Sequence, residues 1–225
     1  MMSDQNHKEA HVSLLEELVL LVVEDDGSIA HTAGTPGFGM AVIGACLVEL
    51  NMQGALDPDL DAMHVLDASE GRGPAYDEVL RTVAAGPVAR TEEWVLKLYP
   101  MAQDIIRHTL DALIARGVLE RGEKRFLWVL KERSYPLKDG REQKEAKRRI
   151  IDTLLSDDIP SAHDTVLLGL ALVGGLLEGF LTRGEIVRLE KRIQEAGGID
   201  LTVRAVETAL SQEQLIRAQE MIYPF

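Results

Sequence analysis

The residues of this chain that could do chemistry gather in one basic stretch, which also contains a run of large apolar side chains. Between Arg116 and Arg149 there are 12 lysines and arginines against 6 aspartates and glutamates, a local charge of +6 (12 − 6). The whole chain carries −13, so the remaining residues carry −19 (−13 − 6). Cations beside a large apolar group suit an anionic surface with an apolar interior, and a lipid leaflet fits that description better than a nucleic acid does.

The residues that we predict to contact lipid are an apolar triplet and the cations around it. A large apolar side chain contributes about 1.5–3 kcal/mol when it is fully buried, and each Lys or Arg near an anionic surface adds about 1 kcal/mol. In a second interpretation the cations form a solvated face and Phe126 and Leu127 pack inward, and composition leaves both interpretations open. The predicted set is Lys124, Arg125, Phe126, Leu127, Trp128, Lys131 and Arg133, with Arg107 as a further cation.

Patterns typical of enzymes and metal sites are weak in this sequence. His7 and His11 do not form the H-E-x-x-H order, and the glycines between Gly34 and Gly39 lack both dinucleotide spacing and a P-loop lysine. Three acids before Gly27 are typical of a solvated turn. His163 and Asp164 have no serine or cysteine that the sequence can place beside them. We therefore expect no catalytic residues, no metal ion and no cofactor.

Composition and apolar runs bear on where the protein works. The single cysteine, Cys46, lies in an apolar run, where a buried thiol is the simplest interpretation. The first 30 residues lack a basic segment followed by an apolar core, so we expect no signal peptide. The longest uncharged apolar run, 166–177, is shorter than the about 20 residues that span a bilayer. These features predict a cytoplasmic protein whose membrane contact is peripheral and reversible.

Periodicity and capping signals predict a mainly helical chain. Ser13 with Glu16 forms a capping box that opens a helix over 14–23, and Thr35 with Pro36 caps a helix over 38–52 that is apolar nearly all round. Thr91 is predicted to cap a further helix. Short strands are expected within 54–66, and two or three helices are expected near the end of the chain, with a break at 197–198. The remaining predicted helices are 75–84, 100–116, 141–155 and 163–181.

One β-hairpin interrupts the helices. The segment 118–130 alternates loosely and contains Arg121-Gly122-Glu123, which predicts a hairpin that turns at these three residues. The predicted fold is mainly α, with a single-domain helical bundle as its core and a protruding β-hairpin. Residues 1–11 are expected to be a flexible N-terminus, and 12–225 a single domain.

A family resemblance is carried by several motifs in order between residues 12 and 181. Each motif is weak alone, but their order and spacing resemble those of the Golgi phosphoprotein 3 family, which has many bacterial members. The motifs are Ser13–Ile29, Gly44–Leu50, Asn51–Leu56, Tyr76–Leu80, Leu113–Leu119, Phe126–Trp128 and Tyr135–Leu137.

The resemblance implies a mostly helical, single-domain peripheral membrane protein. Eukaryotic members bind phosphatidylinositol 4-phosphate on Golgi membranes and retain glycosyltransferases by holding their short cytosolic tails, so a protein cargo is an expected partner. The apolar hairpin of the family is associated with membrane insertion and self-association. Phe126, Leu127 and Trp128 occupy that hairpin here.

The headgroup positions of the family do not carry the family's residues in this chain. Local alignment places them at Gly34, Ile43, Gln103 and Ile106, none of which is basic or aromatic. A phosphomonoester needs charge-assisted donors in fixed geometry. Arg107 is the nearest cation, but one helical step turns a side chain by about 100°. We therefore expect attraction to anionic lipid in general rather than selectivity for phosphatidylinositol 4-phosphate.

Two functions of other classes fit parts of the sequence. The hairpin would equally serve an oligomeric interaction scaffold, in which it joins copies of the protein. A helix over 101–116 followed by a basic hairpin also resembles the recognition helix and wing of a DNA-binding protein. Asp104 and Asp111 beside Arg107 and Arg116 leave that helix almost neutral, whereas a helix that reads a groove is usually basic. Nucleic acid is therefore not the expected partner.

Overall fold

Helices dominate the part of the chain that the computed structural model describes, which is residues 12–125, 131–156, 158–197 and 200–222. Three short 3-10 turns, His31–Gly34, Tyr99–Met101 and Leu177–Gly179, connect some of the helices. The α-helices are α1 (Leu14–Leu20), α2 (Pro36–Met52), α3 (Pro74–Ala84), α4 (Thr91–Leu98), α5 (Ala102–Ala115), α6 (Arg141–Leu155), α7 (Ala162–Val173), α8 (Arg183–Gly197) and α9 (Leu201–Ile222).

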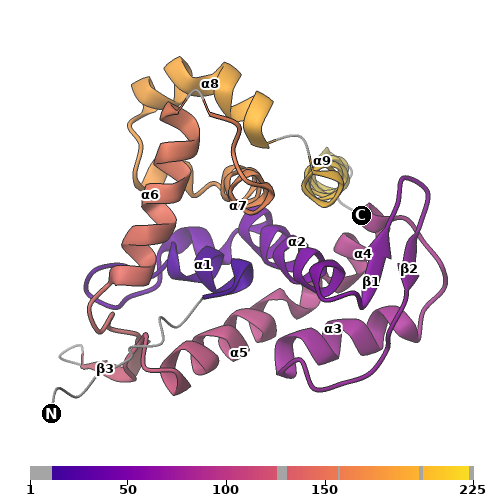
Figure 1. Cartoon of the computed structure of the whole chain (residues 1–225), viewed down its shortest axis with the longest axis horizontal. Helices are drawn as coiled ribbons and strands as arrows, with labels where there is room; N and C mark the ends of the chain where they lie inside the picture. The colour runs from indigo at the N-terminus through magenta and orange to yellow at the C-terminus, as the bar shows by residue number, and fades with distance from the viewer. Residues whose placement is uncertain (1–11, 126–130, 157, 198–199, 223–225) are drawn as a thin grey trace, which may run out of the picture.

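Helix α2 forms the centre of the core, with α1, α5, α7 and α9 packed around it (Figure 1). It begins as the sequence predicts, because Thr35 accepts a hydrogen bond from the Phe38 amide and Pro36 is the first helical residue. Its residues from Phe38 to Leu50 are all buried, which explains why it is apolar on every side. A Cβ atom at Gly44 would lie 2.6 Å from Val206, so this glycine allows α9 to cross closely.

Two small antiparallel hairpins lie at opposite edges of the molecule in Figure 1. Strands β1 (Leu56–Pro58) and β2 (Met63–Val65) pair with Leu56 opposite Val65, as expected for the segment 54–66. Strands β3 (Gly122–Arg125) and β4 (Lys131–Ser134) pair with Gly122 opposite Ser134. The predicted architecture, mainly α with a hairpin, is thereby confirmed.

The predicted position of the hairpin turn is wrong. Gly122 and Glu123 do not form a turn but begin strand β3, and the strands are joined by 126–130, which lie outside the described residues. A Cβ atom at Gly122 would lie 2.4 Å from the Ser134 hydroxyl oxygen. The glycine therefore marks a close approach within the paired strands rather than a turn.

Several helix boundaries also differ from the prediction, and α1 ends at Leu20 rather than at 23. Helix α7 ends at Val173 rather than at 181, because Gly174 follows it and Gly175 adopts a positive φ of 70°. Thr91 is not a capping residue: it is the first helical residue of α4, Arg90 precedes it, and the Thr91 hydroxyl has no hydrogen-bond partner. A threonine followed by two acids resembles a cap whether it lies at the boundary or one residue inside it.

Candidate functional site

The β3–β4 hairpin brings most of the predicted lipid-binding cations together. Its strands contain Lys124, Arg125, Lys131 and Arg133 against the acids Glu123 and Glu132. The register places Glu123 opposite Arg133 and Lys124 opposite Glu132, which are pairs of opposite charge. The last described pair, Arg125 opposite Lys131, has two positive charges. The apolar triplet Phe126, Leu127 and Trp128 follows Arg125 and lies outside the described residues.

The base of the hairpin is fixed to the body by backbone contacts. Leu119 and Leu137 form an isolated bridge beyond the strands, and the Glu120 amide donates to the Pro136 carbonyl at 2.8 Å. From the other side, the Tyr135 amide donates to the Gly27 carbonyl at 2.6 Å. Gly27 has a φ of 79°, and a Cβ there would lie 2.7 Å from the Pro136 nitrogen. The acidic turn that ends in Gly27 is thus the support of the hairpin.

Helix α6 fixes the same region through a buried amide. The Gln143 side chain is buried, and its amide nitrogen donates to the Leu20 carbonyl at 2.8 Å and to the Val23 carbonyl. These carbonyls lie at and just beyond the end of α1, where backbone acceptors have no partner within the helix. Helix α6 and the turn that supports the hairpin are therefore joined through the end of α1.

A buried glutamate binds an arginine and a histidine from two other helices. The Glu17 side chain is 0% exposed; it accepts a hydrogen bond from Arg149 of α6 and lies 2.6 Å from Nε2 of His163 of α7. The hydrogen bond to Glu17 raises the pKa of His163, while partial burial opposes this change. Three helices far apart in sequence are therefore joined by one carboxylate.

Two further glutamates of the family motifs are also structural. Glu16 caps α1 through the Ser13 amide at 2.8 Å and binds Arg116 at 2.6 Å. Glu49 of α2 accepts hydrogen bonds from the Leu15 amide at 3.2 Å and from the Tyr76 hydroxyl. Burial first, and then the neighbouring Glu49, raise the pKa of Tyr76 far above its usual range. These acids hold α1 in place rather than bind a ligand.

Several cations of the basic stretch form ion pairs with carboxylates of the protein. Arg116 and Arg149, at its two ends, bind Glu16 and Glu17, while Arg121 pairs with Asp111 at 2.5 Å. Arg141 pairs with Asp139 at 3.2 Å and Arg148 with Glu145 at 2.8 Å. Within the described residues, the exposed side chains of Lys138 and Lys144, near the hairpin base, have no ion pair. The sequence did not reveal which cations form ion pairs, because most of the partner carboxylates lie outside the hairpin and two lie more than 90 residues away.

Arg107 does not join the hairpin cations. Its exposed guanidinium donates to Asp104 on the same helix at 2.7 Å. Nine residues separate it from Arg116 at the end of α5, which is about 13 Å along a helix axis. The structure therefore separates this predicted lipid contact from the others.

The positions that correspond to the family's headgroup site do not form an anion site here. Ile43 and Ile106 are buried in the core. The Gln103 amide donates to the Ala33 carbonyl at 3.2 Å, which ties α5 to the turn before α2. Gly34 is exposed next to that turn. None of these side chains presents a positive charge.

Large apolar side chains are exposed only far from the hairpin base, as far as the described side chains show. One set lies around β1 and β2, and the other lies on α6, α8, α9 and the loop between α6 and α7. None of these exposed apolar residues lies in 24–27 or 118–121, the described segments that contact the hairpin. The exposed set is Met52, Leu60, Val65, Leu66, Val88, Leu155, Ile159, Val187, Leu201, Leu215 and Ile216.

Two further features of the described residues bear on membrane spanning and on metal binding. No described helix is both long enough and apolar enough to cross a membrane. No group of three or more His, Cys, Asp or Glu in the described part of the chain could hold a metal ion. His7 and His11 lie outside the described residues. Cys46 is buried, and burial raises the pKa of its thiol well above the usual range.

The helical core around α2 and the basic edge hairpin define a mainly helical protein with a charged strand pair as its candidate site. A family model, described as Golgi phosphoprotein 3 (GPP34), matches residues 14–212. The chain therefore belongs to the Golgi phosphoprotein 3 family, as its motifs predicted, and the match extends the resemblance through α8 into α9. A comparison with curated proteins found no match.

Proposed function

We propose that this protein is a peripheral membrane protein that docks reversibly on anionic lipid through the β3–β4 hairpin. The observation that carries the proposal is the register of the strands, which puts Arg125 directly opposite Lys131 at the end of the described ladder. Like charges in opposite positions destabilise an antiparallel pair. Phosphate groups at that end of the hairpin would relieve the repulsion.

The charge of the whole molecule supports the same orientation. The two strands contain four cations and two carboxylates, whereas the whole chain carries −13. An anionic surface therefore attracts the hairpin and repels most of the rest of the molecule. Lys138 and Lys144, in the segment that follows the hairpin, add two exposed lysines to this surface, although Lys138 also lies near the charge of Asp139.

The apolar contribution comes from residues that only the sequence describes. Phe126, Leu127 and Trp128 directly follow the last residue of β3 in the sequence and precede the first residue of β4. If these side chains enter the hydrocarbon, they contribute about 1.5–3 kcal/mol each. The cations supply attraction and the triplet supplies insertion.

We infer that the charge of the lipid matters more than the identity of its headgroup. The four positions that match the family's headgroup site carry no cation, so phosphatidylinositol 4-phosphate lacks the charge-assisted donors that would select it there. It should bind no more tightly than another lipid of equal charge at equal density. We further propose a cytoplasmic, non-enzymatic role that needs no cofactor.

Vesicle flotation with a charge-reversal variant tests the docking proposal. Arg125→Glu gives an opposite-charge pair with Lys131, so the hairpin should form at least as well as before. Reversing one charge removes about 2 kcal/mol of attraction to an anionic surface, which weakens binding about 30-fold. Arg204→Glu on α9 makes the same change of charge on another exposed surface and serves as the control.

The expected result is flotation of wild type and Arg204→Glu with phosphatidylglycerol vesicles, loss of flotation in high salt, and weak flotation of Arg125→Glu. Neutral phosphatidylcholine vesicles should float none of them. Equal flotation of Arg125→Glu and wild type would overturn docking through the hairpin.

An oligomeric interaction scaffold is the second candidate, and the exposed apolar residues around β1 and β2 favour it. Leu60, Leu66 and Val88 are each exposed by more than 60% (72%, 63% and 72%) and suit contact with another protein. The hairpin could also join copies of the chain. Light scattering on Phe126→Asp with Trp128→Asp separates these roles: collapse to a monomer that still floats with vesicles supports the scaffold over insertion.

DNA binding is not favoured by the geometry of α5. Arg107 pairs with Asp104 on the same helix, and Arg116 pairs with Glu16. Neither arginine is thus available for a phosphate without breaking an ion pair. A gel shift with bulk DNA at low salt should show no retardation.

A further inference from the structure

An apolar groove lies between α6 and α8, at the end of α6 that is far from the hairpin. Its volume is about 390 Å³, within the range of small-molecule sites. Leu154 lies buried at its floor, whereas Leu155 is 68% exposed. The apolar lining consists of Ile151, Leu154, Leu155, Phe180, Leu181 and Leu189.

Two charged residues complete the groove, but only one is available to a ligand. The Glu185 carboxylate accepts hydrogen bonds from the Thr182 amide at 2.8 Å and from the Thr182 hydroxyl at 2.7 Å. These bonds, and to a lesser extent the nearby Arg188, lower the pKa of Glu185, and the bonded carboxylate oxygen caps the start of α8. The guanidinium of Arg188 uses only its Nε, which donates to the Gly184 carbonyl at 3.1 Å. Among the described residues its Nη atoms form no ion pair or hydrogen bond, although the charge of Glu185 lies near enough to interact with it.

The neighbouring arginine of α8 has a structural role instead. Arg192 donates from Nη2 to the Ser156 carbonyl at 2.7 Å and to the Asp158 carbonyl at 3.1 Å. It therefore ties α8 to the end of α6 and holds the groove together. Arg188, one turn earlier, is the cation that the groove presents to a ligand.

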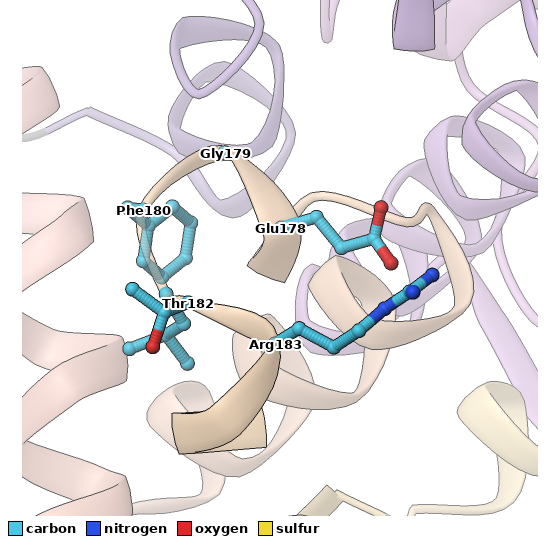
Figure 2. Close-up of a pocket in the computed structure, with 6 residues that line it drawn as sticks. Glu178, Gly179, Phe180, Thr182 and Arg183 are labelled. Carbon is cyan, nitrogen blue, oxygen red and sulfur yellow. The ribbon is translucent and has the colours of Figure 1, made fainter. Parts of the chain in front are cut away.

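The loop that carries Phe180 separates this groove from a more polar hollow. That hollow, of about 560 Å³, is lined by residues 178–183. Figure 2 shows Glu178 and Arg183 extending on one side of the loop and the Phe180 ring on the other. Like the groove, the hollow is lined by one acid and one base. The groove differs because six of its eight lining residues are large and apolar, whereas only Phe180 and Leu181 are so in the hollow.

We propose that the α6–α8 groove binds a long-chain fatty acid, with its hydrocarbon chain against Leu154, Phe180 and Leu189 and its carboxylate on Arg188. A guanidinium binds a carboxylate through two parallel hydrogen bonds, which an alcohol or an ammonium group cannot reproduce. The apolar residues would contact the hydrocarbon chain of the fatty acid, and Arg188 would bind its carboxylate. This site does not depend on the hairpin or on vesicle binding.

Competition against a fluorescent fatty-acid analogue tests the site, with dodecanoate, dodecanol and dodecyltrimethylammonium as competitors below their micelle concentrations. Wild type should bind dodecanoate about tenfold more tightly than dodecanol, and the cationic amphiphile more weakly still. Arg188→Gln should bring dodecanoate and dodecanol to nearly equal affinity. Leu155→Glu and Leu155→Trp should weaken every competitor, the first by charge and the second by filling the groove.

Val187→Glu is the matched control, because Val187 is 67% exposed on the same helix and does not line the groove. It should bind dodecanoate as wild type does. Absence of dodecanoate binding, or equal loss in Val187→Glu and Leu155→Glu, would overturn the proposal. Dodecanoate binding that Arg188→Gln leaves unchanged would also overturn it. Because Leu155 is exposed, its variants should unfold at nearly the wild-type temperature, and they should still float with anionic vesicles.

Discussion

Cations of the same basic stretch have different neighbours in two regions of the molecule. Around α1, Arg116 and Arg149 meet the buried carboxylates of Glu16 and Glu17. In the β3–β4 hairpin, by contrast, the ladder ends with Arg125 opposite Lys131. The first region holds helices together, and the second presents charge at an edge of the fold. Local charge density is therefore a poor guide to function until the partner of each cation is known.

The buried region should be the more sensitive to loss of a charge. Glu17→Gln keeps the size of the side chain but removes the buried carboxylate that Arg149 and His163 share, and leaves Arg149 with only its 3.8 Å ion pair to Glu145. Breaking a buried ion pair on one side costs about 3–5 kcal/mol. Urea unfolding should show a loss of this size in the free energy of unfolding.

Glu178→Gln provides the comparison for that measurement. Glu178 is exposed, so its replacement should change the free energy of unfolding by no more than about 0.5 kcal/mol. If the two variants lose equal stability, the buried cluster does not hold the helices together and the contrast between the regions is lost.

A substitution in the turn that supports the hairpin should have the next largest effect on stability. Gly27→Ala requires a positive φ and a contact of 2.7 Å with the Pro136 nitrogen, so it should destabilise the protein by about 3 kcal/mol. Gly54→Ala requires a similar φ of 71° with nothing within 4 Å, and should cost about 1 kcal/mol. Hydrogen exchange of the Tyr135 amide, which donates to Gly27, should accelerate only in the first variant. Equal effects of both substitutions would mean that the turn does not support the hairpin.

The smallest expected effect concerns His163 and depends on pH. The Glu17 hydrogen bond raises the pKa of His163 in the folded state, so its contribution to stability is full below pH 6.5, the ordinary value, and is lost as pH rises through the folded pKa. The difference in unfolding free energy between wild type and His163→Gln should therefore shrink as pH increases from 5 to 9. The same comparison in a Glu17→Gln background should show no such trend. A difference that is constant with pH in wild type would contradict the proposed coupling.

Local signals predicted the helices well. Ser13 with Glu16 and Thr35 with Pro36 mark the starts of α1 and α2 as expected, and α6 has the predicted bounds of Arg141 and Leu155. These signals succeed because a cap involves residues within one helical turn of each other. The family was also predicted from the order of its motifs, and the match over 14–212 confirmed it.

The misplaced hairpin turn shows where local reasoning failed. Gly122 is a frequent turn residue, but here it avoids a clash with Ser134, which lies 12 positions further along. The lipid-binding set stays a prediction: its four strand cations lie on one hairpin, whereas Arg107 lies on α5 and pairs with Asp104. The α6–α8 groove gave no sequence signal, because its apolar residues follow ordinary helical spacing.

The sequence by itself determined most of the helices, the caps of α1 and α2, the family and the concentration of positive charge, because each depends on residue order over short distances. The tertiary structure decided which cations form ion pairs between distant segments, because Arg116 pairs with Glu16 100 positions away and Arg149 pairs with Glu17 132 positions away. An ion pair is formed through space at a few ångströms, and the distance between two charges in space follows from the packing of α1, α5 and α6 rather than from their separation along the chain.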